Sequence, residues 1–336
     1  MNSMSYLDVH RKFSEEIDME VAAALSQLGT SSRTTRNAVA ALLRHRQLKH
    51  PLTVLPLLVH AAETGNPRPA LPLSAIHLLW WTSACYMDDL ADGHSTEIPG
   101  ELSENEALLS SVVTGNTLPI QIIQSQRIPE SVRGALTTEL ANSWTIAADG
   151  QMEDMRGDIG SATRKSVVET YRGKSGAPFG MITAMAAILS GAPDERIALW
   201  REFGYVFGIL WQLFNDQEDI LSGRNEDLLN GTVTYLLACA AEDAPLPARA
   251  HILSLCAAAG GSRAARAELA EILRGPALLR RYREDIDGFR DEAHRILCRL
   301  GGDATHLPVL RHLVDHAAQM LLQAELVPVG AASGTY

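Results

Sequence analysis

The sequence predicts an all-α protein. Strand signals are nearly absent from its 336 residues, whereas apolar residues recur at helical spacing. Near the N-terminus this spacing produces one apolar stripe, in which a residue repeats at every fourth position: Val9, Phe13, Ile17, Val21 and Leu25. Breaks that contain Gly or Pro separate helical blocks of roughly 15 to 30 residues, at or above the long end for globular helices.

The helical blocks are expected to form a single domain, since neither an internal repeat nor a low-complexity linker interrupts them. We expect an N-terminal helix over residues 1–35 and the main helical domain over residues 36–325. The last segment, residues 326–336, is rich in Gly and Ala and is expected to be a flexible tail.

Composition excludes some function classes. The chain has 29 basic and 40 acidic residues and a net charge of −11, which argues against nucleic acid as a partner. Its four cysteines lie far apart and form no CxxC pair, and the N-terminus shows no signal peptide, so we expect a cytoplasmic protein. The apolar run over residues 70–87 contains a proline, a histidine and hydroxyls, and is expected to be a core helix without stable membrane insertion.

This core helix ends in three aspartates, Asp88, Asp89 and Asp92. On a helix, Asp88 and Asp92 lie one turn apart on the same face, and their like charges repel unless a cation is bound. Mg²⁺ takes oxygen ligands and is usually held by one or two carboxylates together with substrate phosphates. The alternative is a solvated helix end, which is the more common origin of an isolated DDxxD pattern.

A second apolar stretch also ends in acidic residues. Phe207, Trp211, Asn215 and Asp219 are successive i+4 neighbours, so two aromatic rings are expected beneath an Asn/Asp pair, with Asp216 adjacent. A core stripe that happens to reach the surface would give the same pattern. Two such helices, if they faced each other, would form an apolar cavity with a metal-binding rim.

Lys174 is a further candidate, because the chain has only three other lysines. Its ammonium group could bind a phosphate as a point charge. Gln151 and Asp154, in the segment GQMED, are candidate polar partners of that site. A lone lysine more often lies on the surface.

In this order, the motifs DDLAD, Gly115-Asn, GQMED, GKSGAPF, QLFNDQEDIL and EDLLNGT resemble those of the trans-prenyl diphosphate synthases. The resemblance to this polyprenyl synthetase family, part of the isoprenoid synthase superfamily, extends over roughly residues 36–325. It implies a helical bundle around a central apolar cavity, in which two aspartate-rich helices bind three Mg²⁺ ions and a prenyl diphosphate. It also implies a homodimer.

Matched position by position, the resemblance implies six metal ligands: Asp88, Asp89, Asp92, Asn215, Asp216 and Asp219. Asp88, Asp92, Lys174 and Asn215 are the expected catalytic residues. The expected substrate-binding residues are Lys174, Gln212, Arg224, Trp81, Ala84, Phe207, Trp211 and Gln151.

The departures from the family pattern concern positive charge. Chain-elongating members have Lys and Arg where this chain has Gln47 and His50, and a co-substrate His where it has Trp81. An Arg-Arg pair is missing from residues 93–99, and Thr232 replaces a Lys after the second motif. Arg46 and Lys49 could substitute in part if the register slips. Loss of these charges favours ionisation of an allylic diphosphate without binding of isopentenyl diphosphate.

These departures favour a terpene cyclase that acts on a C15 or C20 prenyl diphosphate. Trp81, Trp211 and Phe207 would supply aromatic walls for a cation, and the small Ser83 and Ala84 would leave depth for a long chain. Three different functions would also fit the sequence: a prenyltransferase with an acceptor other than isopentenyl diphosphate, a conventional polyprenyl diphosphate synthase with a shifted basic cluster, and a silent regulatory subunit.

Overall fold

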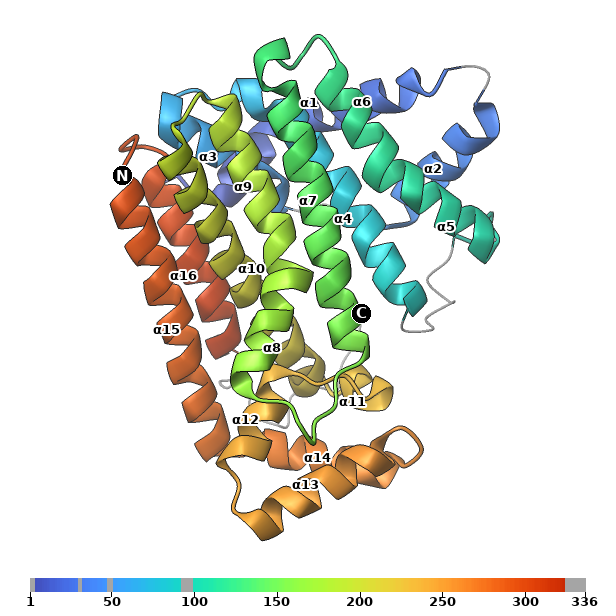
Figure 1. Cartoon of the computed structure of the whole chain (residues 1–336), viewed down its shortest axis with the longest axis vertical. Helices are drawn as coiled ribbons and strands as arrows, with labels where there is room; N and C mark the ends of the chain where they lie inside the picture. The colour runs from blue at the N-terminus through green and yellow to red at the C-terminus, as the bar shows by residue number, and fades with distance from the viewer. Residues whose placement is uncertain (1–3, 30–31, 47–50, 92–98, 324–336) are drawn as a thin grey trace. The chain divides into compact units, whose positions relative to one another are not determined.

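The computed structural model describes residues 4–29, 32–46, 51–91 and 99–323 (Figure 1). These ranges contain helices and connecting segments but no strand, which confirms the predicted all-α class. None of the helices within them combines the length and apolar character that a membrane span requires. The predicted tail, residues 326–336, lies outside the described residues.

Contacts between residues divide the chain into two compact units. Unit 1 comprises residues 1–144, 180–204 and 297–312, and unit 2 comprises residues 145–179, 205–296 and 313–336. Five helices contribute residues to both units: α7 (Glu130–Met155), α9 (Ala177–Leu189), α10 (Asp194–Ser222), α15 (Pro276–Leu300) and α16 (Leu307–Gln323).

Helix α4 (Leu71–Ala91) packs against several other elements of unit 1. It contains the predicted core helix, and its buried side chains include Trp80, which stacks on Trp144 with ring centroids 4.7 Å apart. Its neighbours include α1 (Tyr6–Gln27), η1 (Pro51–Val54), α3 (Leu55–Thr64), η2 (Arg68–Ala70), α5 (Glu104–Val112), the π-helical turn η4 (Val113–Thr117) and α6 (Leu118–Gln124), while α2 (Arg33–Arg46) packs on α5.

The stripe predicted on α1 is buried only in its first half. Val9, Phe13 and Ile17 are buried, but the next buried residue is Ala24, because an every-fourth spacing drifts around a helix with 3.6 residues per turn. A capping box at Ser5 fixes the start of the helix, since its hydroxyl accepts from the Asp8 backbone N–H while the Asp8 carboxylate accepts from the Ser5 backbone.

A partly buried ion pair joins three helical segments of unit 1. The Arg196 guanidinium on α10 donates to both carboxylate oxygens of Glu63 on α3, and the Trp200 indole N–H donates to Glu63 Oε1 over 2.6 Å. Arg196 also donates to the Leu300 carbonyl at the end of α15. These bonds satisfy the desolvated charges, which is the condition for such a pair to be tolerated.

Unit 2 contains the shorter helices of the C-terminal half. Helix α12 (Tyr235–Asp243) packs against α8 (Arg164–Tyr171), α13 (Leu246–Ala259) and α14 (Arg263–Leu273), and α11 (Glu226–Asn230) packs on α13 (Figure 1). Arg164 fastens α8 to the end of α12 through Glu242 and Asp243. The segment Arg172–Gly176, η5, is a π-helical turn between α8 and α9.

Candidate functional site

The candidate site of unit 2 begins at Lys174, in the π-helical turn η5. Its ammonium group donates to Asp154 Oδ2 on α7 over 2.7 Å, and both side chains are mostly buried. Asp154 belongs to the GQMED segment, so the structure brings together these two candidate residues that are twenty positions apart. Single π-helical turns are frequent at functional sites, and the sequence did not predict this one.

Two glycines allow the three helical segments around Lys174 to approach closely. A Cβ atom on Gly150 of α7 would lie 2.3 Å from the backbone nitrogen of Lys174, and one on Gly208 of α10 would lie 2.4 Å from the Ser175 carbonyl oxygen. Both contacts are with backbone and cannot be relieved by a rotamer change. The absence of a side chain at these positions therefore brings η5 against α7 and α10.

The Asp216 carboxylate on α10 lies in a continuous hydrogen-bond network. The Tyr171 hydroxyl donates to Asp216 Oδ2, and the Gln212 amide donates to Asp216 Oδ1 over 2.8 Å. Gln212 in turn accepts from the Ser175 hydroxyl, and the Tyr171 oxygen accepts from the Tyr235 backbone N–H over 2.8 Å. Two predicted site residues of α10, Gln212 and Asp216, are therefore held in place by partners on α8, η5 and α12.

Burial dominates the electrostatics of this network. It raises the pKa of Asp216 to about 6, although the bonds from Tyr171 and Gln212 favour the charged form. Burial, with the neighbouring Asp216, also raises the pKa of the Tyr171 phenol well above its ordinary value, so this hydroxyl remains a donor at neutral pH.

The Asp219 carboxylate binds the beginning of α11. Its two oxygens accept from the backbone N–H groups of Glu226 (3.0 Å) and Asp227 (3.2 Å), and it is 4% exposed. The chain reverses between them at Gly223 and Asn225, both with positive φ, which Gly and Asn tolerate best. The exposed Arg224 lies 3.8 Å from Asp219 Oδ1, beside the second motif.

Because the chain reverses after α10, the Asp227 carboxylate lies near Asp216 and Asp219, and the sequence analysis did not predict it as a site residue. Burial first, and then the nearby Asp216 and Asp219, raise the pKa of Asp227 to about 8. Lys174 opposes this shift. Crowding of carboxylates around one ammonium group fits a divalent cation, which would relieve their repulsion. Among the described residues, no three acidic, His or Cys side chains already converge on one metal position, and Mg²⁺ needs only one or two carboxylates besides waters and substrate phosphates.

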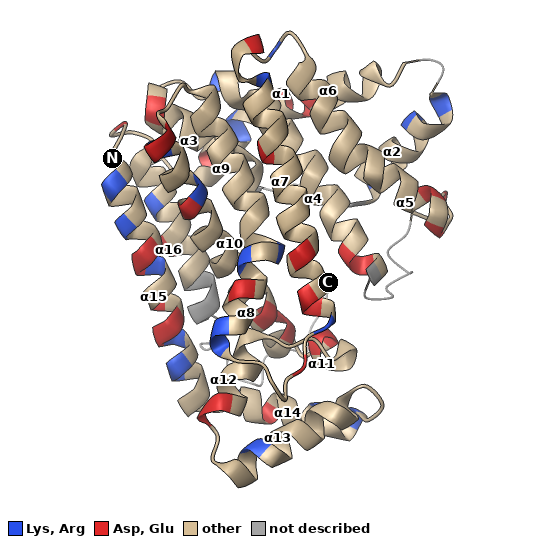
Figure 2. Cartoon of the chain, in the orientation of Figure 1, with Lys and Arg blue, Asp and Glu red and all other residues tan. Residues whose placement is uncertain are grey.

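The candidate site of unit 1 is the acidic C-terminal end of α4, visible in Figure 2. Asp88 and Asp89 are half-buried there, and Asp92 lies outside the described residues. Trp81 and Ala84, on the preceding turns, are also half-buried. Gln47, His50 and residues 93–98, whose missing charges supported the functional prediction, also fall outside the described ranges.

The small residues before DDLAD pack closely against the π-helical turn η4. The buried Ser83 hydroxyl donates to the Ser111 carbonyl over 2.7 Å, and a Cβ atom on Gly115 would lie 2.5 Å from Ser83 Oγ. The Trp144 indole N–H donates to the Gly115 carbonyl over 3.0 Å. Ser83 is therefore used for helix contact, whereas Ala84 is partly accessible.

The predicted aromatic residues of the second motif differ in accessibility. Phe207 is fully buried and packs edge-on against Phe179, with ring centroids 5.2 Å apart. Trp211, one turn closer to the acids, is half-buried beside Phe214. The structure therefore leaves Trp211 accessible to a ligand and places Phe207 in the core of unit 2. Gln151 and Asn215 are half-buried.

Two residues of this site, Tyr171 and Asp227, are not among those that the sequence predicts. Tyr171 precedes Lys174 by three positions, and Asp227 follows Asp219 by eight. Helical periodicity does not reveal either contact, because the Tyr171 contact crosses between helices and Asp227 lies beyond Gly223, where the chain reverses after the end of α10. The roles of Tyr171 and Asp227 therefore could not be predicted from local sequence patterns and became visible only in the tertiary structure.

Comparisons with known proteins agree with this architecture. The family described as polyprenyl synthetase matches residues 101–273, more than half of the chain. A short chain isoprenyl diphosphate synthase of Methanothermobacter thermautotrophicus is 24% identical over 271 residues, which cover 75% of this chain and 80% of that protein.

Solved structures show the same fold at lower sequence identity. The geranylgeranyl pyrophosphate synthetase of Pyrococcus horikoshii has a TM-score of 0.77 and 17% identity, covering 94% of this chain and 99% of its own. The geranylgeranyl pyrophosphate synthase of Corynebacterium glutamicum, solved with isoprenyl diphosphate and magnesium, has a TM-score of 0.75 and 17% identity, with coverages of 92% and 99%. At these identities the likeness establishes the fold.

Proposed function

Because the chain belongs to the polyprenyl synthetase family, we propose that it is a Mg²⁺-dependent enzyme that ionises an allylic prenyl diphosphate of C15 or C20 without elongating it. The proposed product is a cyclic terpene: the allylic cation closes on one of its own double bonds, and the ring cation then loses a proton to give a hydrocarbon or adds water and loses a proton to give an alcohol. Relatives of this chain are named as prenyl diphosphate synthases, which supports the substrate class.

The observation that supports the absence of elongation is the distribution of charge. In unit 2 the chain keeps the ammonium of Lys174 paired with Asp154, the Asp216 carboxylate bonded to Gln212, and the Asp219 carboxylate bonded to the Glu226 backbone. At the positions where the family pattern has basic or co-substrate residues, the chain has Gln47, His50, Trp81 and Thr232. A second diphosphate would therefore find few cations to neutralise it.

The proposed metal ligands are Asp88, Asp89 and Asp92 of the first motif and Asn215, Asp216 and Asp219 of the second, for up to three Mg²⁺ ions. When bound, Mg²⁺ would neutralise the negative charge that develops on the departing diphosphate. Lys174, Gln212 and Arg224 would bind the same group, Lys174 as a positioned point charge beside Asp154. Gln151 is proposed as a further polar contact.

The cation left behind requires walls that do not attack it. Trp211 and Trp81 are partly accessible aromatic side chains whose faces would stabilise positive charge. Ala84, which is small and accessible, would leave space for a long chain. Phe207 is fully buried, so it would support the site by packing in the neighbouring core rather than by contacting the substrate.

The decisive experiment incubates the protein and Mg²⁺ with C10, C15 and C20 allylic diphosphates, each with and without isopentenyl diphosphate. We expect diphosphate release and an extractable hydrocarbon or alcohol from the C15 or C20 substrate alone. If products form only with isopentenyl diphosphate and are longer diphosphates, the enzyme is a conventional synthase. The similarity to a named short chain isoprenyl diphosphate synthase specifically favours this second candidate.

Two additions to this experiment, an aromatic or peptide acceptor and an active homologue, test for a transferase and for a regulatory subunit. Diphosphate release that depends strictly on an added aromatic or peptide acceptor would identify a transferase. Failure to release diphosphate from any allylic substrate, together with binding to an active homologue, would identify a regulatory subunit.

We also propose that the enzyme is a cytoplasmic homodimer. Support comes from apolar side chains that are exposed on α5 and α6: Leu108, Leu109, Val112 and Ile120. Contact with a second copy would remove these side chains from water, which favours association. Light scattering coupled to size-exclusion chromatography should give the mass of a dimer for the wild type and of a monomer for Leu109→Glu. A monomeric wild type would refute the pairing.

A further inference from the structure

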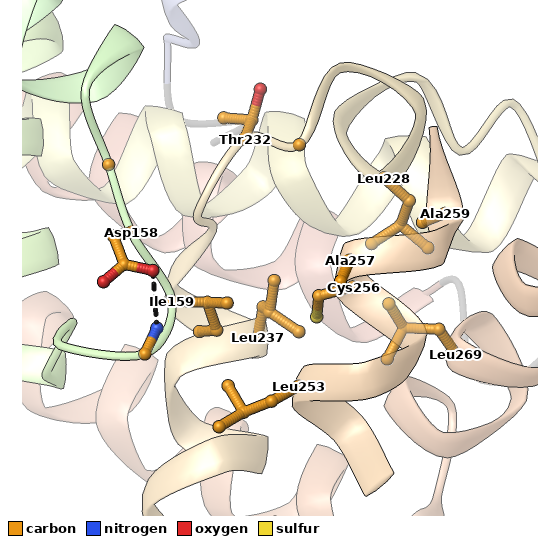
Figure 3. Close-up of a pocket in the computed structure, with 13 residues that line it drawn as sticks. Asp158, Ile159, Leu228, Thr232, Leu237, Leu253, Cys256, Ala257, Ala259 and Leu269 are labelled. Atoms are coloured by element: carbon orange, nitrogen blue, oxygen red, sulfur yellow. Dashed lines mark hydrogen bonds between the residues drawn. The ribbon is translucent and has the colours of Figure 1, made fainter. Parts of the chain in front are cut away.

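Unit 2 contains a cavity of about 320 Å³ whose lining does not include Lys174, Asp216 or Asp219 (Figure 3). One wall is the loop after α7, which includes Asp158 and Gly160, and another is the segment from Leu228 to Thr232. Helices α12, α13 and α14 complete it. Its volume lies near the lower limit of small-molecule sites, which span roughly 300 to 1,000 Å³.

The lining of this cavity is aliphatic. Figure 3 shows the branched side chains that line it: Ile159, Leu228, Leu237, Leu253 and Leu269. None of the described residues in the lining is aromatic, Lys or Arg. The polar groups are Asp158, Thr232, the thiol of Cys256 and backbone.

Charge at the rim selects against an anion. The Asp158 carboxylate accepts from the Gly160 backbone N–H over 3.0 Å, the bond drawn in Figure 3, and from the Ser161 hydroxyl. Arg249 lies outside the lining and donates to the Gly160 carbonyl. A phosphate would meet a carboxylate here without a lining cation, whereas an alcohol would find acceptors in Asp158 and Thr232.

Both walls continue directly into the candidate site. The Gly157 backbone N–H donates to the carbonyl of Asp154, the partner of Lys174. On the other wall, Leu228 follows Asp227, whose backbone N–H donates to the Asp219 carboxylate. The Thr232 N–H closes this segment on the Asp227 carbonyl. A molecule that pushes these walls apart would displace Asp154 through the Gly157 hydrogen bond and Asp219 through the Asp227 hydrogen bond.

We propose that this cavity is a regulatory site for a small neutral aliphatic molecule, a prenyl alcohol or hydrocarbon, whose binding changes diphosphate release through the segment Glu226–Thr232. Binding itself requires neither diphosphate nor Mg²⁺. The effect on activity rests on the proposed function, but the binding does not, so the two can fail separately.

Cys256 provides a direct test of binding, because its thiol lines the cavity and is half-buried. The full-length protein is treated with N-ethylmaleimide, with and without geraniol or farnesol, and labelling is followed by peptide mass spectrometry. We expect labelling of Cys256 to slow about tenfold when the alcohol is present at about ten times its dissociation constant. Labelling of the exposed Cys298 should be unchanged.

Two substitutions on α13 form a matched pair. Ala257 and Ala258 are both exposed, but only Ala257 lines the cavity. Ala257→Phe should fill the cavity and abolish protection of Cys256, whereas Ala258→Phe should retain it. In thermal unfolding, the alcohol should raise the midpoint of the wild type and of Ala258→Phe but not of Ala257→Phe, a result that does not depend on thiol reactivity.

Several outcomes would overturn the proposal. One is equal protection of Cys256 and Cys298, which indicates sequestration of the reagent. Another is equal protection by farnesyl diphosphate without Mg²⁺, which contradicts the neutral chemistry. A third is the absence of any thermal shift that distinguishes the two variants. Protection without a change in diphosphate release would retain the site but refute its regulatory role.

Discussion

At the scale of single residues, the Tyr171 hydroxyl is the least expected part of the candidate site. It bridges the Asp216 carboxylate on α10 and the Tyr235 backbone N–H at the start of α12. These bonds hold the Asp216 carboxylate, a proposed metal ligand, in one orientation. Such orienting partners usually contribute 10- to 100-fold, roughly, to metal affinity.

Tyr171→Phe should therefore raise the Mg²⁺ concentration needed for half-maximal diphosphate release by about 10- to 100-fold. The same shift should occur in Mg²⁺-dependent thermal stabilisation with inorganic diphosphate, which requires no turnover. Tyr282→Phe is the matched control, because its equally buried hydroxyl donates to the Leu213 carbonyl on the same helix α10. If both variants show the same Mg²⁺ dependence, Tyr171 has only a structural role.

His60 on α3 predicts how stability responds to acid. It is 4% exposed, and burial lowers its pKa, although the bond to the Asn66 carbonyl (2.6 Å) and the nearby Glu63 oppose the shift. As the pH falls through about 6.5, the ordinary His value, the unfolded chain binds a proton that the folded chain does not. The free energy of unfolding therefore decreases below that pH, and the decrease ends below the folded pKa.

Urea unfolding at pH 8, 6 and 5 tests this prediction. In His60→Gln the decrease between pH 8 and 5 should be smaller than in the wild type. His251→Gln, at an exposed position, should retain the wild-type decrease. An unchanged decrease in His60→Gln would assign the acid sensitivity to other groups.

At the scale of helical elements, the contact of α7 with η5 depends on Gly150, and the same helix offers a control. Gly150→Ala places a Cβ atom 2.3 Å from the Lys174 nitrogen and should destabilise the fold by about 1 to 3 kcal/mol. Gly134→Ala, with no atom within 4 Å of the new Cβ, should stabilise it by about 0.5 to 1 kcal/mol. Urea unfolding of both variants measures the difference, and a loss of the same size in both would refute the contact argument.

Helical type and apolar burial were predictable from local pattern, and the points where the pattern failed have local causes. The helix α4 from residue 71 was predicted correctly, because a long stretch without charged residues can be buried on most of its surface. The α1 stripe shifted to Ala24 because its spacing exceeds 3.6 residues. The π-helical turns at Val113–Thr117 and Arg172–Gly176 have no periodic signature, so the sequence pattern did not predict them.

At the scale of the whole molecule, metal and ligand removal should change stability by mass action. Mg²⁺ together with inorganic diphosphate should stabilise the wild type by about 2.7 kcal/mol at one hundred times the dissociation constant, and EDTA should remove the gain. Asp88→Ala should lose this gain and diphosphate release while its far-ultraviolet circular dichroism stays unchanged. Retained activity in Asp88→Ala would refute the metal assignment of the first motif.

The sequence predicted the family, which the match over residues 101–273 confirms, and the all-α class, which the described residues confirm. The resemblance to the family named Gln212 and Asp216 as candidates, and the structure joins them by a hydrogen bond one turn apart on α10. Tyr171 and Asp227 were not predicted, because their contacts cross helices or follow a chain reversal. The sequence pattern also could not separate Phe207, in the core, from Trp211, which is accessible, since both lie on the same stripe.

The π-helical turn Arg172–Gly176 makes the chain more sensitive to length than to composition at this point. Tyr171, before the turn, bonds to Asp216, and Phe179, after it, packs on Phe207, so both sides are fixed to the same helix α10. Deletion of one residue within the turn would rotate everything after it by about 100° relative to α8. Homologous grafts and library designs across this segment should therefore exchange residues one for one, and a one-residue gap placed there in an alignment would misassign either Lys174 or the whole of α9.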